Sequence, residues 1–205
     1  MSATIKSGAT TDLVTIDPTS KAMRVTLYNP DGTLVEPRYT YRAATPTIVT
    51  PASSNDVFFL LYGSSTKLVK ISKITVSGFN ITAVQYLVIA LEKFSSSATG
   101  GTASALVKTP LDSTAPASTL ALCSVYTAAP TQGSLEGTIG VKRVLGQATS
   151  AAAAGIPATT DFVFGEQSFV SPIILRGAAE GIGLSFGTAP ASNVSFSLEV
   201  EWTEE

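Results

Sequence analysis

The stretch Ser195-Phe-Ser-Leu-Glu-Val-Glu-Trp202 alternates strictly between small polar or acidic residues and large apolar ones. A period of two is the pattern of a β-strand that turns one face to a core and the other to water. The apolar phase, predicted to lie in the core, consists of Phe196, Leu198, Val200 and Trp202. The acidic residues around it, predicted to form a solvated face, are Glu199, Glu201, Glu204 and Glu205. The end of the chain is therefore predicted to be a half-buried strand.

Short runs of aliphatic, β-branched and aromatic residues recur upstream of this strand, separated by loops rich in Ser, Thr, Ala, Gly and Pro. The runs span 57–62, 68–76, 85–94, 106–109, 120–126, 137–145, 162–164, 173–175 and 182–186. In the second run, Val69 and Ile71 share one phase. Ile74 and Val76 share the other, which predicts a bulge or a strand that changes sheets. Because the sequence shows no long helical pattern and no internal repeat, we predict an all-β fold, an antiparallel β-sandwich of the jelly-roll type.

Turn residues divide the chain into three predicted parts. Residues 1–42 are predicted to be an N-terminal arm or attachment module, with a strand over 22–28 and a turn at 29–32 that allows a short hairpin. Residues 43–56 contain Pro46, Pro51 and many small polar residues, and are predicted to be a linker. The sandwich is expected to occupy 57–205. Within it, segments 95–104 and 146–160 hold few large side chains and are expected to be exposed loops.

The composition argues against most catalytic machinery. The chain has no histidine, so Ser–His and Cys–His nucleophilic devices are excluded. Zinc sites lack ligands, and the carboxylates are too scattered to predict an acid–base pair. The single cysteine, Cys123, lies in an apolar run and is predicted to behave as a small buried hydrophobe. We therefore predict no catalytic residue, no metal site and no cofactor, and a protein that is not an enzyme.

The charge and hydropathy patterns limit the classes of binding partner. The net charge is −2, and no basic stretch is present that could follow a phosphate backbone, so nucleic-acid binding is not expected. The sequence starts without an apolar signal-peptide core, and its longest apolar run, near 86–91, is too short to span a bilayer. We therefore expect synthesis in a cytoplasm and no membrane partner. Low charge with many small apolar residues is typical of a surface that is covered in an assembly.

Two local patterns give further expectations. Arg176 follows an apolar run and precedes a glycine-rich turn that contains Glu180, so the two are predicted to form a structural ion pair. Aromatic side chains that could build a sugar platform are Tyr28, Tyr39, Tyr41 and Tyr62. Cross-strand pairing or capping of the core is the favoured role for these tyrosines.

Two segments of the sequence resemble a diffuse family of tailed-bacteriophage virion proteins. One is Thr15-Ile-Asp-Pro-Thr-Ser-Lys-Ala-Met-Arg-Val-Thr-Leu-Tyr28. The other is Ile174-Leu-Arg-Gly-Ala-Ala-Glu-Gly-Ile-Gly-Leu-Ser-Phe-Gly187 together with the ending Leu198-Glu-Val-Glu-Trp-Thr-Glu-Glu205. The first segment is also similar to N-terminal pieces of phage fibre and decoration proteins, where such a piece would attach the protein to the particle. The resemblance implies a structural part of a phage virion and brings no catalytic residues with it.

The leading hypothesis is a capsid decoration or cement protein located in the virion. It is expected to form a homotrimer through its sandwich and to bind another virion protein, such as the major capsid protein or a fibre, through its arm. The residues expected to make this attachment are Met23, Val25, Leu27 and Tyr28. The alternatives are a tail, neck or baseplate component such as a fibre adaptor, and a glycan- or receptor-binding module. An enzyme is the least favoured class.

Overall fold

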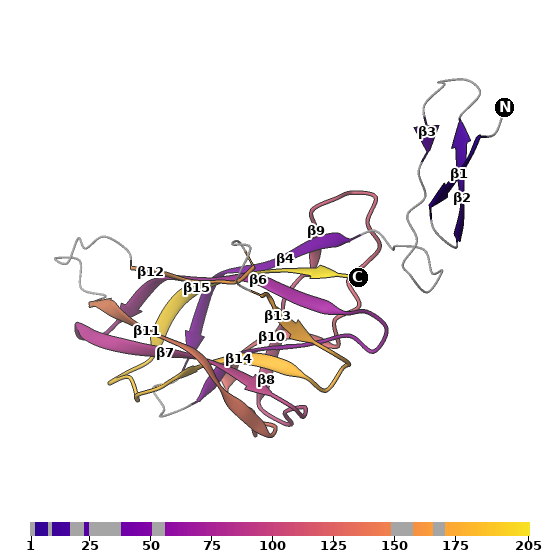
Figure 1. Ribbon diagram of the computed structural model, residues 1–205. Helices are drawn as coiled ribbons and strands as arrows, with labels where there is room; N and C mark the ends of the chain where they lie inside the picture. The colour runs from indigo at the N-terminus through magenta and orange to yellow at the C-terminus, as the bar shows by residue number, and fades with distance from the viewer. Residues whose placement is uncertain are drawn as a thin grey trace. The chain divides into compact units, whose positions relative to one another are not determined.

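The computed structural model describes residues 3–7, 10–16, 23–24, 38–50, 56–148, 158–165 and 171–205. Every regular element among them is a β-strand (Figure 1). No described helix is long and apolar enough to cross a membrane. The chain separates into two compact units, Met1–Pro37 and Arg38–Glu205, called unit 1 and unit 2 below.

Unit 1 contains a small antiparallel sheet in the order β1-β2-β3, with strands at Ala3–Ser7, Thr10–Ile16 and Met23–Arg24. Met23 pairs with Ile16, and Arg24 pairs with Thr15. This pairing covers the beginning of the strand predicted at 22–28. The other proposed attachment residues, Val25, Leu27 and Tyr28, lie outside the described residues.

Unit 2 is an all-β sandwich, as the sequence predicted. Its strands are β4 (Tyr39–Thr50), β5 (Val57–Tyr62), β6 (Val69–Ile81), β7 (Gln85–Phe94), β8 (Thr102–Ala105), β9 (Thr109–Pro110), β10 (Leu122–Ala128), β11 (Leu135–Ala148), β12 (Thr159–Val163), β13 (Ile173–Leu175), β14 (Gly181–Phe186) and β15 (Val194–Glu204). They follow the order β8-β10-β5-β14-β7-β11-β6-β15-β4-β9, with β12 and β13 paired to β6. All of these pairings are antiparallel except β11 with β6.

Strand β11 joins the two layers of the sandwich. Along most of its length it pairs with β7, whereas Gln147 and Ala148 pair with Asn80 and Ile81 of β6. Figure 1 shows the resulting arrangement, in which β4, β6 and β15 lie across from β7, β11 and β14. The curled sheet therefore turns from one layer into the other at this corner, and the core lies between its two halves.

Phenylalanines from both layers fill one part of this core. Phe58 of β5 lies 4.9 Å from Phe196 of β15 and 4.8 Å from Phe186 of β14, measured between ring centroids. Phe196 also stacks on Phe79 of β6 at 5.7 Å. All four side chains are buried. Because β5 and β15 belong to opposite layers, these contacts pack the sandwich together.

The linker predicted at 43–56 is wrong for residues 43–50, which belong to β4 and pair with β15. Ala43 and Ile48 are buried on the inward face. The pairing shifts between Thr45 and Ile48, and the Pro46 carbonyl in this bulge accepts a hydrogen bond from the Ser197 hydroxyl. Proline is tolerated here because β4 lies near the margin of the sheet, where β9 pairs only with residues 41 and 42.

The phase change predicted in 68–76 is a bulge in β6. Trp202 pairs with Ile71 and Glu201 with Lys73, which leaves Ser72 as an extra residue. The Ser72 hydroxyl donates to the Glu201 carbonyl at 3.1 Å. This single inserted residue lets the apolar side chains on both sides of it face the core, as the sequence pattern predicted.

Segment 95–104 is largely exposed, as predicted, but hydrogen bonds and apolar contacts anchor it at Ser96 and Ala98. The Tyr62 hydroxyl accepts the Ala98 N–H at 2.8 Å and donates to the Ser96 carbonyl at 3.2 Å. Tyr62, Phe94 and Tyr126 form part of a second, smaller apolar cluster. The end of the segment belongs to β8, and 106–109, predicted as a strand, lies mostly between β8 and β9. The segment contains only small residues, but it packs at Ala98 against the aromatic side chains of this cluster.

Candidate functional site

The four residues predicted to be core from the β15 alternation are all buried, each at most 1% exposed. Trp202 stacks on Tyr41 with ring centroids 5.8 Å apart. On the opposite face of β15, Arg42 contacts both Glu199 and Glu201. These residues hold the sandwich together and do not converge on a site.

The ion pair predicted between the side chains of Arg176 and Glu180 takes a different form. The backbone N–H of Arg176 donates to Oε2 of Glu180 at 3.0 Å, while the Arg176 side chain is exposed. The same Glu180 oxygen lies 3.9 Å from Nζ of Lys93. The glycine-rich turn between β13 and β14 brings the carboxylate back onto the backbone of its own turn, so the local contact replaces the predicted one.

Cys123 lies on β10, where it is buried against the main core. Burial raises the pKa of its thiol to about 12, although the charge of Lys108 acts in the opposite direction. A thiol with so high a pKa holds almost no thiolate at neutral pH, which disfavours nucleophilic chemistry.

The tyrosines considered as a sugar platform do not form one. Tyr41 and Tyr62 are buried, and Tyr39 is partly buried. Tyr28 lies outside the described residues. The tyrosine that is most exposed among those described is Tyr86 of β7, at 67%, which the sequence did not single out.

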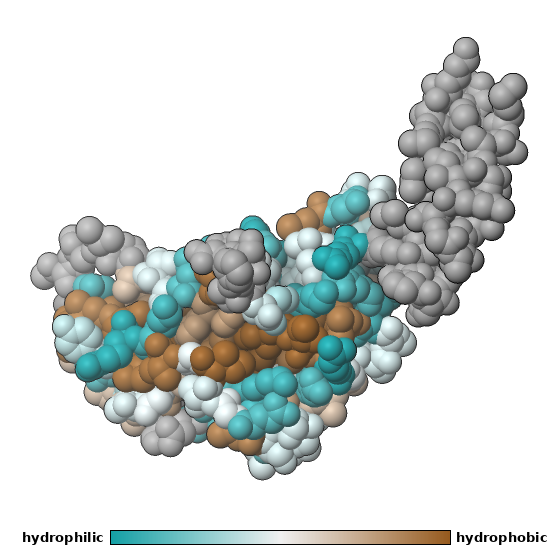
Figure 2. Space-filling view, in the orientation of Figure 1, coloured by the Kyte–Doolittle hydropathy of each residue, from teal (hydrophilic) through white to brown (hydrophobic). Residues whose placement is uncertain are grey.

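Exposed apolar side chains concentrate on β11 and its neighbours. Leu145 pairs with Tyr86, Arg143 with Val88, and Val141 with Ala90 in the β7–β11 register. Val141 is 56% exposed and Leu145 is 37% exposed. We call the surface formed by Tyr86, Val88, Val141, Arg143 and Leu145 the β7–β11 face. Figure 2 shows hydrophobic residues gathered along the side of unit 2 on which β11, β12, β13 and β14 lie in Figure 1.

Arg143 is the charged residue of the β7–β11 face. The Arg143 guanidinium lies over the Tyr86 ring, 5.3 Å from its centroid. This cation–π contact places the planar guanidinium against the aromatic face and keeps its charge at the surface. An exposed apolar surface that carries a single guanidinium is suited to docking against protein and lacks the convergent polar groups of a small-molecule site.

A cluster of hydrogen-bonded polar groups lies at the end of β15. Glu204 is buried, and Oε1 accepts hydrogen bonds from the Ser118 hydroxyl at 2.6 Å and from Trp202 Nε1 at 2.9 Å. Oε2 accepts the Thr119 N–H at 2.9 Å and the Thr119 hydroxyl at 2.7 Å. Burial disfavours the charged form, but these four hydrogen bonds outweigh it and hold the Glu204 pKa below its ordinary value. The solvated position predicted for Glu204 is therefore wrong.

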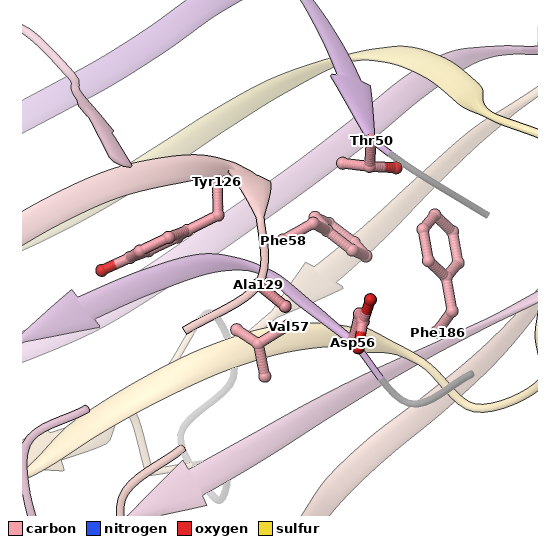
Figure 3. Close-up of a pocket in the computed structure, with 7 residues that line it drawn as sticks. All are labelled: Thr50, Asp56, Val57, Phe58, Tyr126, Ala129 and Phe186. Atoms are coloured by element: carbon pink, nitrogen blue, oxygen red, sulfur yellow. The ribbon is translucent and has the colours of Figure 1, made fainter. Parts of the chain in front are cut away.

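A small hollow is present beside the ends of β4 and β5 (Figure 3). Thr50, Asp56, Phe58 and Phe186 line it, and the Tyr126 ring is directed away from the two phenylalanine rings. The buried Thr50 hydroxyl has no hydrogen-bond partner among the described residues. Nor do the described residues contain a group of three or more acidic or cysteine side chains that could hold a metal ion. One carboxylate and one hydroxyl beside apolar rings are too few to build a catalytic constellation.

Comparison with known proteins does not identify a family for this chain. No protein-family model matches the chain, and no curated protein matches it. A chain in a solved structure, described as "Structure of infectious bursal disease virus Gx strain", is similar at 10% sequence identity with a TM-score of 0.20. That match covers 97% of this chain and 47% of the other. At so low a TM-score the likeness carries no argument about fold or function.

Proposed function

We propose that this protein is a non-enzymatic structural component of a tailed-phage virion, a capsid decoration or cement protein. In this proposal unit 2 self-associates, and unit 1 attaches the assembly to the major capsid protein or to a fibre. The sequence resemblance of both ends of the chain to phage virion proteins supports the class. The protein would be made in the cytoplasm of the bacterial host and would act on the particle.

The observation that carries the proposal is the β7–β11 face. Unit 2 has a well-packed core, yet Tyr86, Val141 and Leu145 stay in water on one surface. Contiguous exposed apolar surface on a soluble domain marks an interaction site. We propose that its occupant is another copy of the chain in a closed homotrimer, because closed symmetry covers the same patch on every copy.

The separation of the chain into two units supports separate roles for them, attachment by unit 1 and self-association by unit 2. The boundary after Pro37 places β4, including Tyr41 and Arg42, within unit 2. A variant meant to remove only the attachment module should therefore lack 1–37, and not 1–42 as the sequence suggested. Removal of residues 38–42 would also take away the Tyr41–Trp202 stack and the contacts of Arg42 with β15.

Light scattering tests the self-association. The wild-type chain and the variant lacking 1–37 should both have the mass of a trimer. Val141→Glu introduces a charge into the β7–β11 face and should give a folded monomer. Val107→Glu is the matched control, because Val107 is 78% exposed on the segment between β8 and β9, and this variant should stay trimeric. A wild-type monomer, or a trimer that survives Val141→Glu, would refute this assembly surface.

Particle composition tests the location. The protein would be tagged in the phage that encodes it, and purified particles would be analysed by mass spectrometry and immunogold electron microscopy. Many copies distributed over the capsid are expected for a decoration protein. A few copies at the neck or tail would favour the fibre-adaptor alternative, and particles without the protein would refute a virion role.

A further inference from the structure

Segment 112–119, part of the connection between β9 and β10, is held to the rest of unit 2 largely by hydrogen bonds. Most of its residues are exposed, and its apolar side chains are only alanine and proline. The Leu111 N–H donates to the Thr40 carbonyl at 2.9 Å, and the Tyr41 hydroxyl donates to the Pro116 carbonyl at 3.1 Å. Three further hydrogen bonds, from Ser118 and Thr119, end on the carboxylate of Glu204. The Thr119 hydroxyl also lies 2.8 Å from the Ser64 hydroxyl. Glu204 therefore accepts three of the hydrogen bonds that hold this segment.

The donors around Glu204 are matched to an ionised carboxylate. Each of its oxygens receives one hydroxyl and one N–H: Oε1 from Ser118 and Trp202, Oε2 from Thr119. A hydroxyl can reverse its role and accept a hydrogen bond, but an indole or backbone N–H cannot. A proton on one oxygen would be donated to the reversed hydroxyl beside it, and that oxygen would keep only its weaker remaining acceptor capacity for the N–H. The neutral acid therefore binds this set of donors less strongly than the ionised carboxylate does.

The geometry points to an acid-sensitive latch: we propose that ionised Glu204 holds segment 112–119 against β4 and β15, and that its protonation releases the segment. The low pKa of Glu204 agrees in direction, since a group with a depressed folded pKa stabilises the closed form at higher pH. That stabilisation is lost as the pH falls below the carboxyl's ordinary value of 4.5 and through the lower folded value.

Other titratable and charged groups face this region and must be separated from Glu204. On β4 they are Tyr39 and Tyr41, with Arg38 just before the strand; Lys70 lies on β6, Glu205 follows β15, Lys108 precedes β9, and Asp112 begins the segment itself. Among these groups, Asp112 and Glu205 carry carboxylates. Asp112 bonds within its own turn, through the N–H and hydroxyl of Thr114. Glu205 bonds to Lys70 and Arg38. Only these two carboxylates need controls.

Trp202 is an intrinsic fluorescence probe of this site, because it is the single tryptophan and its indole N–H donates to Glu204. Trp202 fluorescence of the full-length protein would be followed from pH 7 to pH 2, with far-UV circular dichroism recording global unfolding. We expect a fluorescence transition with its midpoint below pH 4.5, before the strands are lost. Glu205→Gln and Asp112→Asn should keep this transition. A fluorescence signal that changes only with global unfolding would overturn the proposal.

Glu204→Gln imitates the released state at neutral pH. The glutamine NH₂ group replaces one carboxylate oxygen and cannot accept the N–H that this oxygen accepts in the wild type. Hydrogen exchange at pH 7 should be at least tenfold faster in residues 111–121 of this variant, with the amides of β6 and β7 unchanged. Exchange equal to wild type would overturn the proposal. If Glu204→Gln fails to fold, Ser118→Ala decides, since loss of one donor should move the fluorescence midpoint to higher pH. An unmoved midpoint would contradict the latch.

Discussion

Replacement of Phe196 by alanine tests the packing that joins the two layers of unit 2. Phe196 is 1% exposed, and its ring lies 4.9 Å from Phe58, 5.7 Å from Phe79 and 6.5 Å from Phe186. A buried Phe→Ala change costs about 3–5 kcal/mol through lost transfer free energy and the cavity that remains. Each aromatic pair adds about 0.5–1.5 kcal/mol beyond burial, although neighbouring pairs are not additive. We expect unit 2 to lose about 4 kcal/mol of unfolding free energy.

Urea denaturation measures this loss, with Trp202 fluorescence and far-UV circular dichroism as the two probes. With a slope of about 2 kcal/mol/M, the midpoint of Phe196→Ala should fall by about 2 M while the slope stays the same. Phe196→Leu fills most of the volume and should cost less than half as much. Val107→Ala, at an exposed site, should change the unfolding free energy by no more than about 0.5 kcal/mol. A Phe196→Ala protein within 1 kcal/mol (~0.5 M) of wild type would refute the claim that these rings join the layers.

Three further expectations follow from burial and backbone geometry. Trp202→Ala should destabilise unit 2 by about 3–5 kcal/mol, because the side chain is fully buried; a normal melting temperature would contradict its place in the core. Cys123, with a pKa raised to about 12, should react with a thiol reagent only after unfolding, so rapid labelling of the native protein would disprove its burial. Gly100 and Gly101 both have positive φ, but a Cβ at Gly101 would lie 2.8 Å from the Ala128 carbonyl oxygen, whereas one at Gly100 meets nothing within 4 Å. Gly101→Ala should therefore lower the melting temperature more than Gly100→Ala, and equal effects would rule out the close contact.

The sequence predicts strands best where large apolar side chains recur on one phase. β15 and β7 have such side chains, and the predicted runs 195–202 and 85–94 agree closely with them. β5 agrees with the predicted run 57–62, although its residues are apolar and buried on both phases. The same signal predicted either a bulge or a change of sheet in β6, and the structure has the bulge, because inserting Ser72 changes the phase of every following residue. In these elements the local pattern and the tertiary packing demand the same arrangement.

The sequence fails where packing partners decide the outcome. β4 buries residues as small as Ala43 and contains Pro46, which is a strong loop signal by itself. Only its position near the sheet margin and its bulge against β15 make proline acceptable there. In β11 the apolar residues Ile139 and Val141 are exposed, although the sequence cannot distinguish them from the buried Val144. Hydrophobicity identifies strands, but it does not say which face another layer will cover.

Glu204 is the instructive case, because the sequence did contain a signal for it. The inward phase of β15 runs through the even positions from Phe196 to Trp202, and Glu204 is the next member of that series. Glu199, Glu201 and Glu205 fall on the opposite phase. A carboxylate at an inward position must either be desolvated at high cost or find donors, so position alone implies a partner set. What the sequence could not give was the identity of those donors, since Ser118 and Thr119 lie 86 and 85 residues away along the chain. An acid that continues a buried phase is therefore a better guide to a polar anchor than the local density of charge.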